Sequence, residues 1–231
     1  MELSRSHVLY RKAAAVKDWL VTLACSAGFV TDPQTIELDG NRAKFRVTTA
    51  AERWRVRQQM RETDVLRELL GEVRIGDCFW DVGSAVGTYS CLAADAGADP
   101  VAFEPHPKNH SRCEENFDLN GLDAPVYRLA LSDRSGTMQL STGGAVGTGT
   151  FQLSKSGDTE VETVRGDEVD APAPDVIKVD VEGHELRVLQ GMGRVLEVAR
   201  VIFVECHPDH GVDVDQVREF LNKRGFVVET N

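Results

Sequence analysis

The sequence lacks the features that mark membrane, secreted and zinc-binding proteins. No apolar run approaches the roughly 20 residues that a membrane-spanning helix needs. Charges interrupt the N-terminal segment MELSRSHVLYRKAAAVKDWL, so neither an anchor nor a signal peptide is predicted. None of the five cysteines lies in C-x-x-C spacing, which argues against a zinc site or a disulfide framework. These absences predict a cytoplasmic protein with free thiols and no metal.

Basic residues are outnumbered by acidic ones, 26 to 37, which gives a formal net charge of −11. This balance argues against a nucleic-acid partner, whose phosphates require a basic patch. However, the acids are spread along the chain and arginine outnumbers lysine, a pattern typical of halophilic proteins. High salt would screen the repulsion between an acidic protein and RNA. A basic groove could form around Arg53, Arg55 and Arg57. RNA therefore stays open as an alternative partner. The sequence leaves open whether the chain forms a homo-oligomer.

Residues 1–60 are predicted to form an extension that packs against a main domain of residues 61–231. Apolar positions at helical spacing predict a helix over 8–28. Strand-like segments on either side of Asp39-Gly40 predict a tight hairpin. A second helical pattern over 57–73 places four apolar side chains on one face: Val65, Leu66, Leu69 and Leu70.

From Asp77 onward, strand-like and helical patterns alternate. Strands are predicted over 78–82, 100–104, 125–131, 175–181 and 200–206. Helices are predicted over 87–97, 107–120, 184–197 and 213–224. The segment 141–160 is rich in Gly, Ser and Thr and is predicted to be a long loop with one strand at most. This alternation predicts an α/β fold with a doubly wound, mostly parallel sheet.

In such a sheet, ligands bind outside the carboxyl ends of the strands, so the polar residues at the strand ends are the candidates for a site. The first strand runs into the glycine-spaced turn DVGSAVG. Gly83 and Gly87 allow the backbone to approach a ligand closely, but the spacing is not the G-x-G-x-x-G of dinucleotide-binding proteins. Asp81 suits a ligand that carries an ammonium group. A turn that only reverses the chain is the simpler alternative.

Two further strand ends offer contacts to a nucleoside. Glu104 lies about 20 residues beyond the glycine turn, where a carboxylate can accept hydrogen bonds from ribose hydroxyls. An exposed glutamate at the strand end is the alternative. Ser132 ends the next strand, a position equally suited to a nucleobase edge and to a simple turn.

The segment IKVDVEGHE places several charges at the mouth of a central strand, which is costly unless they are paired or lie in a cleft. Strand alternation predicts that Lys178, Asp180 and Glu182 share one face. A carboxylate between them could take a proton from a hydroxyl. A structural pair of Lys178 with Asp180, with Glu182 and Glu185 placed at a helix N-terminus, is an equally good interpretation.

The last strand ends in ECHPDH, which brings Glu205 and two histidines, His207 and His210, to the same edge. His207 could act as a general base near neutral pH. The pair His207 and His210 suggests a metal site only weakly, because no third ligand is evident from the spacing.

Six segments together resemble the FkbM-type methyltransferases, which use S-adenosylmethionine and have the class I Rossmann-like fold. They are FWDVGSAVGTYS, VAFEPHPKN, NFDLNGL, RLALSDRSG, DVIKVDVEGHELRVLQGM and VIFVECH. The similarity runs from about Leu66 to His207, and the K-x-D-x-E-G-x-E segment after FEP is its most specific part.

The resemblance implies a role for each site residue. S-adenosylmethionine would be bound by Asp81, Gly83, Ser84, Gly87, Glu104, Pro105, Ser132 and Asp180. Within this set, Glu104 would bind the ribose and Ser132 the adenine. Glu182 and Glu205 would lie on the acceptor side. The family largely methylates oxygen on sugars and secondary metabolites, so a hydroxyl of a sugar, glycan or small metabolite is the implied acceptor.

The sequence also departs from the family pattern. Ser84-Ala85 stands where the family often has Ala-Asn, and Arg165-Gly166 makes Asp167 an uncertain equivalent. Class I folds finish with an antiparallel hairpin, whereas only one strand pattern, GFVVET, follows the last helix. Either the final strand is absent or the N-terminal hairpin supplies it.

Methyl transfer to a hydroxyl requires a base to accept the proton. Asp180 is the first candidate and His207 the second, with Lys178 orienting the acceptor or tuning Asp180. A metal could replace the base, with Asp180 and Glu205 as ligands, but the spacing does not demand one. The alternatives are an RNA methyltransferase and a non-catalytic S-adenosylmethionine-binding protein. An NAD-dependent dehydrogenase should show G-x-G-x-x-G, which is absent.

Overall fold

The computed structural model describes residues 32–49, 52, 63–141, 152–154 and 157–229. Its centre is a five-stranded sheet in the order β11-β10-β3-β4-β5, in which every neighbouring pair is parallel. The strands are β3 (Cys78–Val82), β4 (Asp99–Phe103), β5 (Val126–Tyr127), β10 (Val176–Val179) and β11 (Val201–Val204). The first strand of this sheet along the chain, β3, lies in its middle. The next two strands, β4 and β5, extend the sheet to one edge, and the chain then returns to form β10 and β11 on the other side of β3. This reversal confirms the predicted doubly wound sheet and places its switch point between β3 and β10.

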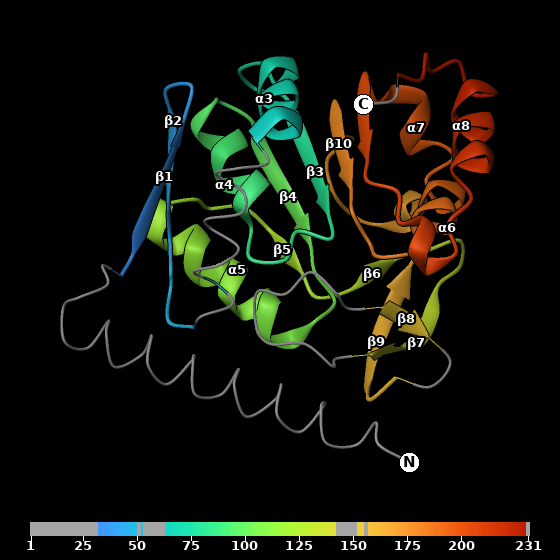
Figure 1. The fold of residues 1–231 in the computed structure, drawn as a ribbon, viewed down its shortest axis with the longest axis horizontal. Coiled ribbons are helices and arrows are strands. Elements are labelled where there is room, and N and C mark those ends of the chain that lie inside the picture. Colours follow the sequence, from blue (N-terminus) through green and yellow to red (C-terminus); the bar gives the residue numbers. More distant parts are fainter. Residues whose placement is uncertain (1–31, 50–51, 53–62, 142–151, 155–156, 230–231) are drawn as a thin grey trace, which may run out of the picture.

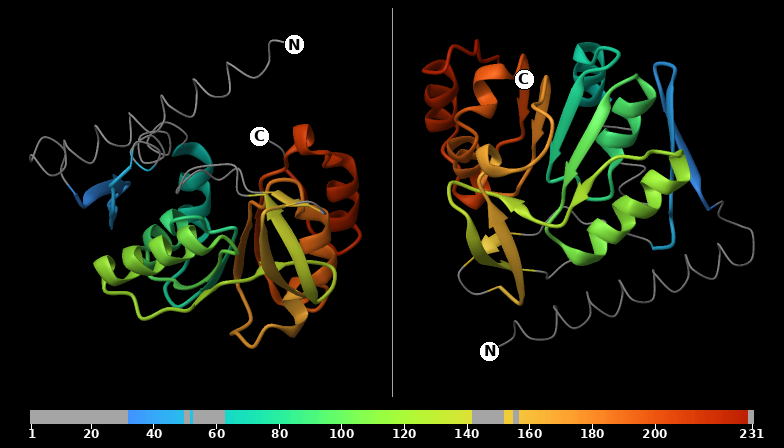
Figure 2. Two further views of the ribbon diagram at one scale, coloured as in Figure 1. Left: turned by 90° about the horizontal axis from the view of Figure 1, so that it is seen from below. Right: turned by 180° about the vertical axis from the view of Figure 1, so that it is seen from behind.

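Helices cover both faces of this sheet (Figures 1 and 2). One face carries α3 (Thr63–Glu72), α4 (Thr88–Asp95) and α5 (Pro107–Asn120), and the other carries α6 (Glu185–Gly191), α7 (Val195–Val198) and α8 (Val214–Asn222). Successive strand residues point to opposite faces, so Phe79 packs in the first core and Trp80 in the second. Burial on both faces explains why all of β3 is buried. Among the described residues, no helix combines the length and the apolar composition needed to cross a bilayer.

The predicted helix over 184–197 is two helices. Asp167 explains the break, because its carboxylate accepts hydrogen bonds from the N–H groups of Arg194 and Val195 at 2.9 and 3.1 Å. A side chain far away in sequence therefore starts α7 as a separate helix. In α3, Leu66, Leu69 and Leu70 are buried as predicted, but Val65 is 47% exposed, so its assignment to the buried face is wrong.

The predicted hairpin is confirmed as β1 (Gln34–Leu38) and β2 (Asn41–Phe45), with Asp39 and Gly40 at φ values of 50° and 92°. It forms a two-stranded sheet of its own and packs on α4 and α5, so it does not supply a strand to the main sheet. The strand predicted in GFVVET is also wrong, because residues 226–229 have no strand structure. The helix predicted over 8–28 and the first part of that over 57–73 lie outside the described residues. The division at residue 60 stays a prediction.

A second sheet, which the sequence analysis missed, lies beyond the carboxyl ends of β3 and β4 (Figure 1). Its order is β6-β9-β7-β8, with β6 (Ala130–Leu131), β7 (Gly136–Ser141), β8 (Gln152–Ser154) and β9 (Thr159–Val164). The single strand predicted over 125–131 divides between the two sheets as β5 and β6. The long loop predicted over 141–160 contains β8 and the start of β9. Leu140 and Val161 form the small core of this sheet.

The two central strands β3 and β10 end so close together that only glycine fits between them. Gly83 has a φ of 80°, and a Cβ atom there would lie 1.9 Å from the carbonyl oxygen of Asp180. The N–H of Asp180 donates to the carbonyl of Val82 at 3.0 Å, which extends the pairing up to this point. The glycine turn is therefore needed for the contact between the strands themselves.

We expect Gly83→Ala to destabilise the protein by more than about 3 kcal/mol, since the left-handed backbone costs about 1–2 kcal/mol and the clash with Asp180 adds to it. Gly40→Ala is the matched control, because Gly40 also has a positive φ of 92° but nothing lies within 4 Å of its Cβ position. Urea unfolding of both variants measures the difference. Equal losses in the two variants would contradict the close approach of β3 and β10.

Candidate active site

The glycine turn after β3 is held by the carboxylate of Glu104 at the end of β4. The N–H of Ala85 donates to Oε2 at 2.8 Å, and the N–H of His106 donates to Oε1 at 2.9 Å. Ala85 has a positive φ of 50°, which turns its N–H toward the carboxylate. Glu104 is buried, so both charge-assisted hydrogen bonds lie away from water, where the electrostatic attraction is stronger.

A pocket opens between this turn, the end of β10 and the second sheet. Five of the residues selected from the sequence line it: Gly83, Glu104, Pro105, Asp180 and Glu182. The other lining residues were not selected from the sequence. They are the polar Asn109 and an apolar wall of Val82, Ala85, Phe103, Leu129, Ala130, Leu131, Leu140 and Val181. Asn109 belongs to the segment VAFEPHPKN and could have been selected. Leu140 lies in β7 of the second sheet, and no sequence motif around it indicates a binding site. The pocket therefore combines an apolar wall with a carboxylate edge.

Lys178 lies at the back of this carboxylate edge. Its Nζ is 3.4 Å from Asp81 Oδ1 and 3.4 Å from Asp180 Oδ2, and it lies over the ring of Tyr89. Burial alone would lower the pKa of Lys178, but the charges of Asp81 and Asp180 outweigh it and raise the pKa above its usual value. Lys178 is therefore an ammonium ion whose single positive charge is shared between two carboxylates.

Four of the residues predicted to bind the cofactor do not line the pocket. Asp81 is fully buried, and its Oδ2 accepts hydrogen bonds from the N–H and hydroxyl of Ser90. The buried hydroxyl of Ser84 contacts the thiol of Cys113. Gly87 begins α4 beside the same thiol, where a Cβ would lie 2.7 Å from Sγ.

Ser132 is the fourth of these residues. Its side chain is fully buried, and its hydroxyl hydrogen-bonds His184 Nε2 at 2.8 Å. Burial lowers the pKa of His184 to about 4, so the imidazole is neutral at pH 7. The hydroxyl also donates to Asp133 Oδ1 at 3.1 Å, so the structure places Ser132 between a neutral imidazole and a carboxylate, next to the pocket residues Ala130 and Leu131.

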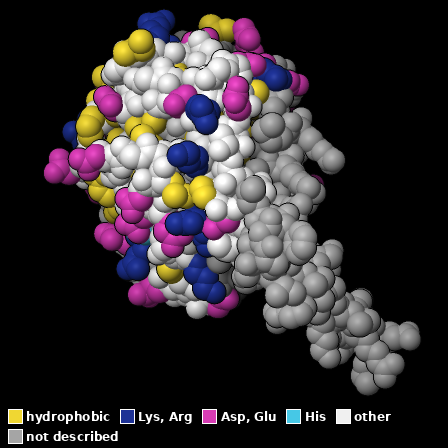
Figure 3. Space-filling view, turned by 90° about the vertical axis from the view of Figure 1, so that its left-hand side faces the viewer, with side chains coloured by type: hydrophobic (Ala, Val, Ile, Leu, Met, Phe, Trp, Pro, Cys, Tyr) yellow, Lys and Arg dark blue, Asp and Glu magenta, His cyan; other side chains and the backbone are white. Residues whose placement is uncertain are grey.

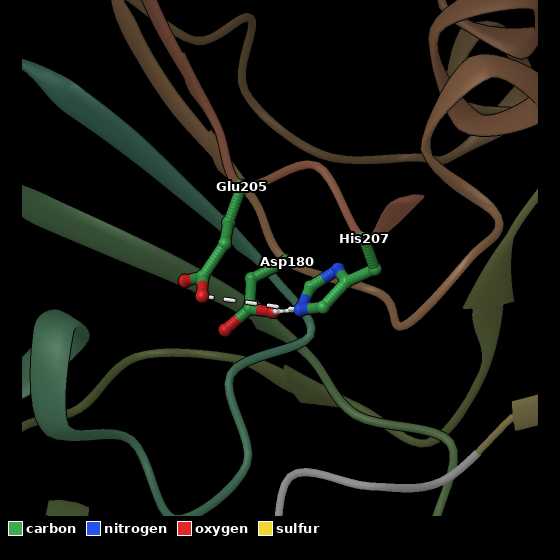
Figure 4. Close-up of side chains that lie close together, drawn as sticks. All are labelled: Asp180, Glu205 and His207. Atoms are coloured by element: carbon green, nitrogen blue, oxygen red, sulfur yellow. Dashed lines mark ion pairs between the residues drawn. The ribbon is translucent and has the colours of Figure 1, made fainter. Parts of the chain in front are cut away.

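Beside the pocket, the ends of β10 and β11 bring Asp180, Glu205 and His207 together (Figure 4). His207 Nε2 is 3.7 Å from Asp180 Oδ1 and 3.8 Å from Glu205 Oε1. Its Nδ1 is 2.6 Å from Oε1 of the buried Glu185. Burial alone would lower the pKa of His207, but the hydrogen bond to Glu185 and the charges of Glu182 and Asp180 raise it. Both proposed bases therefore belong to one cluster.

The two glutamates of the predicted acceptor side also belong to this edge. Glu182 has a φ of 52°, and its Oε2 lies 3.0 Å from His210 Nδ1, so His210 is paired with an acid. Burial raises the pKa of Glu182, and burial together with the charge of Asp180 raises the pKa of Glu205. The edge thus has more negative than positive charge.

The doubly wound parallel sheet, with its switch point between β3 and β10 and helices on both faces, defines a class I Rossmann-like fold. The family model for the methyltransferase FkbM domain matches residues 81–228. The hexuronic acid methyltransferase AglP of Haloferax volcanii is 36% identical over 225 residues, which cover 96% of this chain and 92% of that protein. The chain belongs to the FkbM methyltransferase family and is a methyltransferase.

Solved structures of more distant proteins also match. The FkbM methyltransferase from Methylobacillus flagellatus has a TM-score of 0.48 and 16% identity, over 66% of this chain and 39% of that one. A precorrin-6Y C5,15-methyltransferase from Geobacter metallireducens has a TM-score of 0.46 and 16% identity, over 72% and 73% of the two chains.

The residues proposed for an RNA groove, Arg53, Arg55 and Arg57, lie outside the described residues. On the face that carries the N-terminal hairpin, acidic and basic side chains are interspersed (Figure 3). An RNA acceptor, a cytoplasmic location, halophily and self-association stay predictions from the sequence.

Replacing Lys178 with methionine leaves the buried Asp81 without its cation, so we expect Lys178→Met to destabilise the protein by about 3–5 kcal/mol. Lys223→Met is the control, since Lys223 and its partner Glu219 are 69% and 65% exposed and their pair contributes less than about 0.5 kcal/mol. Urea unfolding at pH 7 measures both variants. A loss below about 1 kcal/mol in Lys178→Met would show that the buried pair is not structurally required.

Proposed function

We propose that the protein transfers a methyl group from S-adenosylmethionine to an oxygen atom of a sugar, with a hexuronic acid as the first acceptor to test. One observation carries the proposal: Glu104 and the glycine turn share a pocket with Asp180 and Glu182. The pocket thus joins a surface suited to a nucleoside to one suited to proton transfer. The name of the relative from Haloferax volcanii supports the choice of acceptor.

The residues around the pocket fit the parts of S-adenosylmethionine. The carboxylate of Glu104 accepts the backbone N–H groups of Ala85 and His106 and also lines the pocket, where a carboxylate suits the hydroxyls of a ribose. The apolar wall of Leu129, Ala130 and Leu131 suits the flat adenine. The full burial of Asp81 favours an indirect role, in which it fixes Lys178 behind the site.

S-adenosylmethionine supplies a methyl group that is already activated by the positive charge on sulfur. The protein has to align the acceptor oxygen and to accept its proton. Asp180 is the proposed base, because its side chain is 26% exposed, lines the pocket and is held by Lys178. His207, 3.7 Å from Asp180, is the second candidate. As the C–O bond forms, the hydroxyl proton moves to the base and a neutral thioether leaves.

We expect Glu104→Gln to weaken the binding of S-adenosylmethionine by about 10–100-fold, since charge-assisted hydrogen bonds contribute about 1–3 kcal/mol. Glu162→Gln, on the exposed side of β9, is the control and should bind as the unmodified protein does. Isothermal titration calorimetry measures both, and circular dichroism checks that the fold is kept. Unchanged affinity in Glu104→Gln would exclude the ribose contact.

Loss of the base should stop transfer to a hydroxyl. We expect Asp180→Asn to lower the rate of methyl transfer to glucuronic acid by at least about 100-fold, as measured with methyl-labelled S-adenosylmethionine. Glucose serves as the neutral comparison, and Asp209→Asn, at an exposed position in the 3-10 helix Pro208–His210 after β11, as the control variant. A product stable to mild alkali is a methyl ether at a hydroxyl, whereas a labile product is an ester at the carboxylate. Full activity of Asp180→Asn would exclude it as the base.

A further inference from the structure

Three potential metal ligands converge at the carboxyl ends of two neighbouring strands. The ligand atoms of Asp180, Glu205 and His207 all lie within 4.8 Å of one another, and Figure 4 shows the three side chains pointing toward a common space. Asp180 follows β10, and the other two follow β11. These strands pair in parallel up to Val179 and Val204. The group is thus built on the ends of adjacent sheet strands.

His207 is oriented as a metal-binding histidine is. The carboxylate of Glu185 can only accept a hydrogen bond, so the 2.6 Å contact requires a proton on His207 Nδ1. In the neutral imidazole this leaves the lone pair of Nε2 facing Asp180 and Glu205. Metal-binding histidines commonly donate their other N–H to a carboxylate in this way. The Nε2 distances of 3.7 and 3.8 Å are too long for hydrogen bonds, so these three groups do not satisfy one another directly.

The carboxylate edge around His207 has an excess of negative charge, which a bound cation would neutralise. Asp180, Glu182, Glu185 and Glu205 surround His207. The nearest ammonium, that of Lys178, is shared between Asp180 and the buried Asp81. In addition, Oε2 of the fully buried Glu185 has no hydrogen-bond partner among the described residues. An acidic acceptor such as a hexuronate would also be repelled by this edge.

We infer that Asp180, Glu205 and His207 bind a divalent cation of the Mn²⁺ and Mg²⁺ class. Two carboxylate oxygens and one imidazole nitrogen suit such ions, and an octahedral ion keeps positions for oxygen atoms of the acceptor. The ion would neutralise the carboxylate edge toward an acidic sugar and lower the pKa of a bound hydroxyl. This role toward the acceptor rests on the proposed function, whereas cation binding itself does not. His210, which the sequence pairs with His207, contacts Glu182 and lies outside the ligand set.

Titration of the full-length, metal-free protein with Mn²⁺ tests the inference, with calorimetry and electron paramagnetic resonance as readouts and neither cofactor nor sugar present. We expect one site that Mg²⁺ competes for. Glu205→Gln removes one ligand charge from a side chain that is 62% exposed, so the fold should be kept and Mn²⁺ affinity should fall by at least about tenfold. Asp209→Asn removes the same charge from the nearby 3-10 helix Pro208–His210 and should leave the affinity unchanged.

Two results would overturn the inference. One is the absence of Mn²⁺ binding at millimolar concentration in the unmodified protein. The other is equal affinity in Glu205→Gln and Asp209→Asn, which would show only diffuse attraction to an acidic surface. A separate titration of the Glu104→Gln variant with S-adenosylmethionine and with Mn²⁺ distinguishes this failure from that of the proposed function, because Glu104 lines the pocket but is not one of the three cation ligands.

Discussion

The ammonium group of Lys178, buried between Asp81 and Asp180, is the interaction on which the site depends. It joins β3 to β10 at the switch point of the sheet, where the chain of Gly83 touches the backbone of Asp180. Buried charges are tolerated only when their partners are held in place. The same ion pairs therefore stabilise the parallel pairing of the two strands and fix the carboxylate that lines the pocket.

The central strands could be predicted closely from the sequence, because strands buried on both faces read as continuous apolar runs. The second sheet could not. The alternation of polar and buried residues in β9 is a strand signal by itself, but the pairing of β9 with β6 and β7 depends on contacts between segments distant in sequence. Likewise, the break before α7 depends on Asp167, which is remote in sequence.

The candidate site was predictable to a similar degree. Strand ends identify which residues reach the carboxyl edge, so Glu104, Asp180 and Glu182 were found together in one pocket. A strand end does not reveal whether a side chain turns outward or inward. Ser132, predicted to bind adenine, turns inward to His184. The convergence of Glu205 and His207 on Asp180 is a property of strand order, which local spacing does not contain.

The central claim is that the pocket at the switch point binds S-adenosylmethionine. Calorimetric titration of one protein preparation with S-adenosylmethionine and with NAD tests it most directly. The account predicts saturable binding of S-adenosylmethionine at one site and no binding of NAD, because the turn lacks the G-x-G-x-x-G spacing for a pyrophosphate and Glu104 faces a pocket lined by Leu129 and Leu131. Binding of NAD without any binding of S-adenosylmethionine would contradict it.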